Sequence, residues 1–182
     1  MTPETISICT GARIDRAQRF AAELCAGMAI YRIDTPARQA AFLAQIGHES
    51  GGLRYTTELW GPTPAQIRYE GRTDLGNVQP GDGSRFRGHG LIQVTGRANH
   101  ARATYRLRQR FGSEVPDFEI NPEALAEPRW TVLSACDFWD DKNLNVLADA
   151  GDFLKITRVI NGGINGLADR QALYASALRA LS

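Results

Sequence analysis

Cysteine is scarce in this sequence. The 182 residues include three, Cys9, Cys25 and Cys136. A disulfide framework needs paired cysteines and a thiolate metal site needs closely spaced ones, but here the number is odd and no C-x-x-C spacing occurs. We therefore expect three buried or idle thiols, with neither a disulfide scaffold nor a cysteine metal centre.

Histidine is equally scarce, which excludes a common zinc motif. The three histidines are His48, His89 and His100. The stretch "HES" begins like the H-E-x-x-H motif of zinc proteases, but the position four residues after His48 is Gly52. The sequence thus predicts no bound metal and no other cofactor.

No charge of one sign dominates the chain. It holds 21 Lys and Arg against 20 Asp and Glu, a net charge of +1. Nucleic-acid and anionic-membrane binders show a basic excess instead. We interpret the arginine-rich run at residues 102–110 as a solvated helix face rather than a phosphate contact, and we expect no nucleic-acid partner.

Long apolar runs are missing as well. None approaches the ~18 residues of a membrane span. The N-terminal stretch "MTPETISICTGARIDRAQRF" carries acids and arginines where a signal peptide needs an uninterrupted apolar region. We expect a protein made in the cytoplasm, without stable membrane insertion.

The composition fits one globular domain. With 43% hydrophobic and 23% charged residues, a chain of this length can bury its own core. We interpret residues 1–182 as a single catalytic domain without a separate binding domain, and we expect a monomer.

Helical periodicity dominates the chain. Apolar residues recur at i, i+3, i+4 and i+7, which predicts helices at 13–29, 36–50, 65–69, 97–111, 128–142, 152–160 and 167–181. Residues 61–90 are rich in Gly and Pro and predict loops around the short third helix. In "FRGHGLIQVT" the period becomes two, which predicts a short strand with Gln93 and Thr95 on its polar face. The fold class is therefore mainly α with a small β element.

Two glutamates flank the Gly-Gly turn that ends the second predicted helix. Glu49 continues the apolar face of that helix at its C-terminus, where burial and the helix dipole both oppose a negative charge. We expect a raised pKa, which suits a general acid. The alternative is a structural glutamate paired with an arginine. Glu58 follows the turn; alone it reads as a surface glutamate, but two acids around a cleft are the working pair of a glycosidase.

Four motifs in order resemble glycoside hydrolase family 19, particularly its phage and prophage endolysins. They are "FLAQIGHESGG", "YEGRTDLGN", "FRGHGLIQVTGRANH" and "RVINGGINGLADRQALY", from about Phe42 to Tyr174. The resemblance implies a mainly α fold of the α+β lysozyme-like superfamily, with two lobes, a small β element and a central substrate cleft. It also implies hydrolysis of a β-1,4 glycosidic link with inversion, for which the two carboxyls stand roughly 6.5–9.5 Å apart.

The resemblance also assigns roles to individual positions. Glu49 matches the general acid and Glu58 the base that activates water, while Thr95 matches the residue that holds this water. The remaining matches are to substrate-binding positions, His48, Gln93, Asn99, Asn161 and Arg170.

For several of these residues a purely structural role is the alternative. "TGRAN" is also an ordinary helix start, and Asn161 lies in an Asn-Gly-Gly helix stop. Arg170 falls in the apolar register of its helix, and a buried arginine needs an anionic partner. Where the family's chitinases place a second glutamate for this arginine, the chain has Asn165.

Two further departures from the family pattern concern histidines. His89 stands where arginine is usual, and His100 stands where tyrosine commonly follows the asparagine. Either departure can alter sugar contacts or pH dependence, and the alternative is a tolerated polar replacement.

The substrate expected from this resemblance is the glycan strand of bacterial peptidoglycan. The enzyme would cut between N-acetylmuramic acid and N-acetylglucosamine, in the periplasm or cell wall, after a holin-like pore or another lesion permeabilises the membrane. The alternatives are a chitinase and a catalytically silent wall-binding module; the missing signal disfavours the first and the presence of both acids disfavours the second.

Overall fold

The computed structural model describes residues 1–182 and is mainly helical, which confirms the predicted fold class. The chain divides into two compact units. Unit 1 comprises Met1–Arg54 and Ala135–Ser182, and unit 2 comprises Tyr55–Ser134. The prediction of one catalytic domain over the whole chain stays a prediction.

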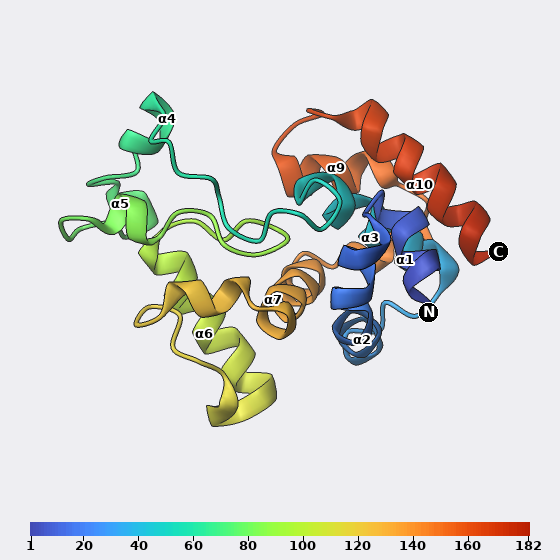
Figure 1. Ribbon diagram of the computed structural model, residues 1–182, viewed down its shortest axis with the longest axis horizontal. Coiled ribbons are helices and arrows are strands. Elements are labelled where there is room, and N and C mark those ends of the chain that lie inside the picture. Colours follow the sequence, from blue (N-terminus) through green and yellow to red (C-terminus); the bar gives the residue numbers. More distant parts are fainter. The chain divides into compact units, whose positions relative to one another are not determined.

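Unit 1 is built around α3 (Pro36–Glu49), which begins at a Thr35 cap and a proline in its first turn. Its neighbours are α1 (Pro3–Thr10), α8 (Leu144–Asp149) and α10 (Leu167–Leu181), and α2 (Ile14–Ile30) packs on α1. Figure 1 shows α1, α3 and α10 side by side. Residues 40–47 of α3 are all buried, so this helix is the core of the unit. The unit also contains α9 (Phe153–Asn161).

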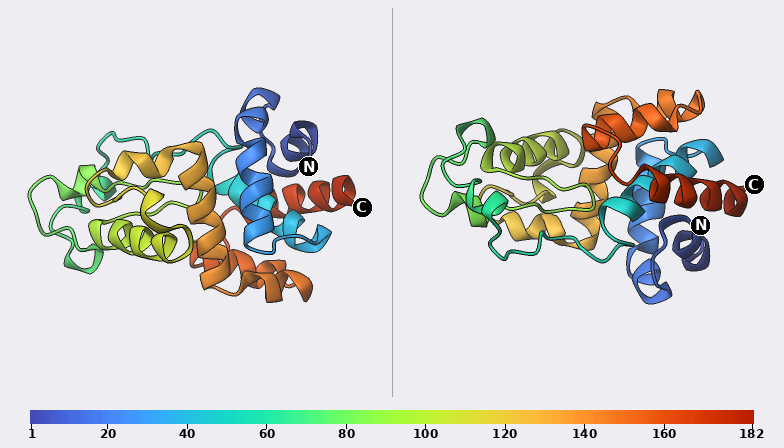
Figure 2. Two further views of the ribbon diagram at one scale, coloured as in Figure 1. Left: turned by 90° about the horizontal axis from the view of Figure 1, so that it is seen from below. Right: turned by 90° about the horizontal axis from the view of Figure 1, so that it is seen from above.

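Unit 2 consists of short helices and loops around α6 (Arg97–Phe111). Its short α-helices are α4 (Pro64–Ile67) and α5 (Asp82–Arg85). Three 3-10 turns complete it, η1 (Thr73–Leu75), η2 (Gly112–Glu114) and η3 (Pro122–Ala126). Figure 2 shows α5 and its loops at the N-terminal end of α6, where Arg97 binds the buried Asp82 at 2.5 Å. The helix α7 (Pro128–Asp141) contributes residues to both units.

Most predicted helices are confirmed within one or two residues. The exact matches are α6 and α10, whose ends the sequence marks with glycine. Three α-helices were not predicted, α1, α5 and α8, because with 8, 4 and 6 residues they are too short to show a repeated apolar spacing.

The predicted strand is wrong. Instead of running straight, the chain reverses between His89 and Val94, which pair with each other through two backbone hydrogen bonds of 2.7 and 3.0 Å. Gly90 permits the reversal with a φ of 99°. The alternation of apolar and polar residues therefore reflects a tight turn, and the β structure is limited to two isolated bridges, Thr57 to His89 and His89 to Val94.

No helix in the structure has both the length and the apolar character needed to cross a membrane.

Candidate functional site

Glu49 is the last residue of α3, immediately before a turn in which Gly51 and Gly52 take φ of 60° and 68°. Its Oε1 accepts a hydrogen bond from Arg170 Nη2 at 2.5 Å. The Glu49 side chain is 21% exposed and that of Arg170 only 1%. The buried arginine thus has the anionic partner that the sequence required. Arg170 binds the Oε1 atom of Glu49 and leaves Oε2 without a hydrogen bond.

Arg170 is held on every side of its guanidinium. Nη1 donates to Gln45 Oε1 at 2.5 Å, and Nε donates to the backbone carbonyl of Asn165 at 3.2 Å. Gln45 in turn donates to Thr157 Oγ1 at 2.8 Å, which donates to the carbonyl of Phe153. Where the family's chitinases have a second glutamate, this chain therefore uses a backbone carbonyl and a neutral amide. Glu49 is the only carboxylate bound to Arg170.

His48 lies beside Glu49 and is tied to the start of α10. Its Nδ1 lies 2.5 Å from Asp169 Oδ2. The ring packs directly on Gly166, which has no room for a Cβ there and has a φ of 69°. The predicted substrate-binding histidine thus joins the ends of α3 and α10, and Asp169 is a partner that the sequence did not reveal.

Asn161 is the last residue of α9, and Gly162 ends this helix in the left-handed conformation. The helix-stop reading of Asn-Gly-Gly is therefore correct for the glycine. The side-chain Oδ1 of Asn161 is buried and has no hydrogen-bond partner. Since buried acceptors are normally paired, this atom is suited to a ligand donor.

Glu58, in unit 2, is surrounded by hydrogen-bond donors. Oε2 accepts from the backbone nitrogen of Gly88 at 2.9 Å. Oε1 accepts from Gln66 Nε2 at 2.9 Å and from the Tyr69 hydroxyl at 3.4 Å. Burial and the nearby Glu58 charge raise the pKa of Tyr69, so this phenol keeps its proton and remains a donor. Both oxygens of the Glu58 carboxylate therefore act as hydrogen-bond acceptors within unit 2.

Thr95 follows directly after a residue that is paired with the segment next to Glu58. His89 forms antiparallel bridges with both Thr57 and Val94, and the Glu58 backbone nitrogen donates to the Gly88 carbonyl at 2.7 Å. Beyond Val94 the register changes, because the Gly96 backbone nitrogen donates to the carbonyl of Phe86. The bridges through His89 therefore bring the backbones of Glu58 and Thr95 into one part of unit 2.

Gln93 and Asn99 belong to the same part of unit 2. Gln93 Nε2 donates to the Gly90 carbonyl at 2.9 Å, and its amide covers the Cα of Gly88 so closely that a Cβ there would overlap it. Asn99 Nδ2 donates to the Thr95 carbonyl at 2.7 Å. The residue at the N-cap of α6 is Gly96, and no side chain makes a capping hydrogen bond there. Thr95 therefore does not cap this helix. The backbone nitrogen of Arg97 instead donates to a distant side chain, Asn77.

The two histidine departures from the family pattern contact each other. His89 Nδ1 lies 3.0 Å from His100 Nε2, and His100 Nδ1 lies 2.9 Å from the Gly96 carbonyl. Both side chains are fully buried. Burial lowers the pKa of His89, and it lowers that of His100 to about 4. The departures are therefore a matched neutral pair of the unit 2 core, with Glu123 3.4 Å from His89 Nε2.

Two other acids close to Glu58 in the sequence, Glu70 and Asp74, bind other groups. Glu70 accepts from the backbone nitrogens of Gly81 and Gly83 at 2.6 and 2.8 Å, which fixes the loop before α5. Asp74 binds Arg72 through both carboxylate oxygens. Glu70 and Asp74 are thus both engaged in the local structure of the loops between α4 and α5.

Sequence reasoning missed the residues that hold the two acids, Gln45, Gln66 and Tyr69. A signal existed for Gln66, because "TPAQ" has the S/T-x-x-E/Q pattern of a capping box. Its contact with Glu58 has no sequence signal, since it depends on how the chain folds back over eight residues.

Comparison with known proteins shows the family of this chain. No family model matches the chain. A protein of Haemophilus influenzae described as a "Glycosyl hydrolase family 19 domain-containing protein" is 34% identical to it, and the match covers 75% of this chain and 76% of that protein. The chain belongs to glycoside hydrolase family 19, and it is therefore a glycoside hydrolase. The narrower resemblance to phage and prophage endolysins stays a prediction.

Proposed function

We propose that this glycoside hydrolase cleaves the β-1,4 link between N-acetylmuramic acid and N-acetylglucosamine in peptidoglycan, with inversion at the anomeric carbon. The observation that carries the proposal is the setting of Glu58. Its carboxylate accepts hydrogen bonds from three donors, and the bridges through His89 bring Thr95 into the same part of unit 2. This is what a base needs in order to take a proton from a water that a hydroxyl holds in place.

Glu49 is the proposed acid. Arg170 fixes its Oε1 and leaves Oε2 unbound, so Oε2 is the oxygen that would deliver a proton to the leaving group. Glu58 would remove a proton from water as that water attacks the anomeric carbon. In this scheme His48, Gln93, Asn99, Asn161 and Arg170 bind or orient the sugar chain and the acid. The buried unpaired Oδ1 of Asn161 supports such a role for this residue.

The choice of peptidoglycan rests on the motif resemblance to phage and prophage endolysins. An endolysin is made in the bacterial cytoplasm and reaches the cell wall once a holin-like partner opens the membrane. We propose this route, and a monomer acting on glycan strands, for this chain. Chitin shares the β-1,4 backbone and lacks only the lactyl groups, so the acid and base alone do not separate the two substrates.

Digestion of purified peptidoglycan, followed by mass spectrometry, tests substrate and chemistry together. The proposal predicts muropeptides with new reducing ends at N-acetylmuramic acid and without 1,6-anhydro groups, since water is the nucleophile. A parallel digestion of chitin is the control. Rapid release of chitooligosaccharides with intact peptidoglycan strands would replace the substrate by chitin, and anhydro products would reject hydrolysis.

A further inference from the structure

We propose that Gln66 is a positioning residue for Glu58, and that its side-chain NH2 group holds the carboxylate in place. The inference rests on the proposed role of Glu58 as the base. Gln66 itself is buried, with 5% of its surface exposed, and is placed to act on Glu58 rather than on a substrate.

The orientation of the Gln66 amide is determined by its neighbours. Oε1 accepts from the backbone nitrogens of Gly61 and Thr63, at 3.2 and 2.8 Å. Backbone N–H groups can only donate, so the oxygen must be on that side. Nε2 then faces Glu58 Oε1 at 2.9 Å and the Leu59 carbonyl at 2.7 Å, and both of these only accept when Glu58 is ionised.

The two ends of this amide have separable tasks. The oxygen belongs to the capping box of α4, in which Thr63 and Gln66 satisfy each other's backbone nitrogens. The NH2 group takes no part in the cap. A glutamate is the other residue that completes a capping box. Gln66→Glu therefore keeps the cap and removes only the donor to Glu58.

The groups that surround Glu58 determine how the Gln66→Glu substitution affects it. Tyr69 is the titratable group in contact with it, and Arg72 lowers the pKa of Tyr69 against the larger effect of burial. On the neighbouring segment, Arg87 and His89 turn to Glu123 and His100 instead. No basic side chain is hydrogen-bonded to Glu58, so the donors that hold its carboxylate are all neutral.

In the Gln66→Glu variant two carboxyl groups would lie about 3 Å apart, and such a pair holds one shared proton to higher pH. The acidic limb of the pH–rate profile should therefore move upward by at least ~1 pH unit, with at least ~10-fold less activity on that limb. The loss of activity relative to the wild type at the same pH should shrink as the pH rises and both groups ionise. The melting temperature should stay close to that of the wild type because the cap is retained.

The test measures cleavage of solubilised peptidoglycan at limiting substrate from pH 4 to 9, together with thermal melting. Gln109→Glu, an exposed position on α6 in the same unit, is the matched control and should leave the profile unchanged. Glu58→Gln is measured alongside. If Glu58→Gln is inactive while Gln66→Glu keeps the wild-type profile, the positioning role is overturned and the base assignment stands. Loss of activity at every pH, together with a lowered melting temperature, would also overturn the positioning role, because it would show that Gln66 is purely structural. Full activity of Glu58→Gln would instead refute the base itself.

Discussion

Glu49 and Glu58 are the same kind of residue in two different electrostatic settings. In unit 1, Glu49 binds a guanidinium that is 99% buried and has no other carboxylate partner. In unit 2, Glu58 binds an amide, a backbone nitrogen and a phenol, all neutral. A charged partner couples the carboxylate to the stability of the unit, because either charge left alone is costly. Neutral donors orient a carboxylate without that coupling.

The difference also bears on how each residue can be tested. A change at Glu49 should alter activity and folding together, whereas a change at Glu58 should alter mainly activity.

Glu49→Gln should have the largest effect. Loss of the proposed acid should lower activity by ~10²- to 10⁴-fold. In addition the variant leaves the Arg170 charge unbalanced, so the free energy of unfolding should fall by roughly 1 to 3 kcal/mol. Clearing of permeabilised cells and urea unfolding measure the two effects. Glu23→Gln, on α2, is the control and should change neither; wild-type lysis by a folded Glu49→Gln protein would remove the acid assignment.

Glu58→Gln should lower activity by at least ~10²-fold. Its stability should fall by about 1 kcal/mol or less, because only one of the neutral donors loses its acceptor. Steady-state rates and unfolding curves are compared with those of Glu49→Gln. A loss of stability as large as that at Glu49 would contradict the contrast, as would normal activity here alongside inactive Glu70→Gln.

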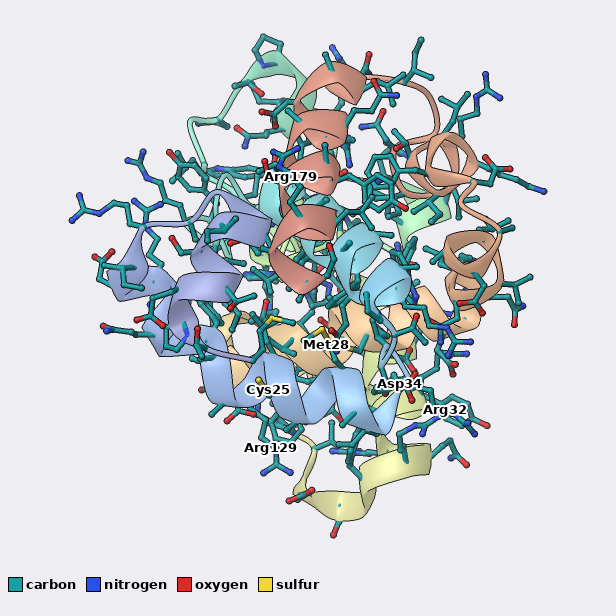
Figure 3. The ribbon with its side chains drawn as sticks, turned by 90° about the vertical axis from the view of Figure 1, so that its right-hand side faces the viewer. Cys25, Met28, Arg32, Asp34, Arg129 and Arg179 are labelled. Atoms are coloured by element: carbon teal, nitrogen blue, oxygen red, sulfur yellow. The ribbon has the colours of Figure 1, made fainter.

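Arg170→Ala should destabilise unit 1 by about 3 kcal/mol, since it removes the partner of a mostly buried carboxylate and two further hydrogen bonds. Activity should fall as well. Arg179, on the same helix in Figure 3, is exposed and binds only Ser176, so Arg179→Ala is the matched control. Equal melting temperatures for the two variants would show that the buried pair contributes nothing to stability.

The histidine pair predicts a pH effect in unit 2. Burial lowers the pKa of His100 from 6.5 to about 4, and that of His89 in the same direction. Between these two pH values the unfolded chain binds protons that the folded chain does not. The free energy of unfolding should thus fall as the pH drops from about 6.5 to 4, by about 3 kcal/mol from His100. Urea unfolding across this range measures it.

A double variant supplies the control for this pH effect. His89→Arg with His100→Tyr carries the residues usual in the family and should flatten the decline between pH 6.5 and 4. An unchanged decline would assign the pH dependence to other groups.

The smallest effect is expected from reductant. All three cysteines are free thiols, two of them buried and the third, Cys25, on α2 in Figure 3. Adding dithiothreitol should leave the melting temperature of the protein unchanged, and substituting Cys25 with Ser should preserve activity. A marked fall in melting temperature with reductant would reveal a disulfide in the purified protein.

Features that depend on residues close together in the chain could be predicted from the sequence. The helix α10 was placed correctly because its apolar spacing and its flanking glycine are local, and the same spacing directed Arg170 inward. The strand at residues 86–95 was wrong because alternation has the same appearance in a strand and in the turn that Gly90 allows. The partners of Arg170 were only half predictable. Gln45 lies 125 residues away in the chain, and the Asn165 contact uses a backbone carbonyl, for which residue identity gives no signal.

In the proposed mechanism Glu58 takes a proton from one attacking water while Glu49 gives a proton to the leaving-group oxygen, which inverts the anomeric carbon. Proton NMR of the newly formed reducing end, recorded within the first minutes of glycan cleavage and before mutarotation, tests it most directly. Because the cleaved bond is β, the account predicts that the α-anomer appears first and the β-anomer only later. A β-anomer that appears first would show retention, and with it a glycosyl–enzyme intermediate that this assignment of the two glutamates does not allow.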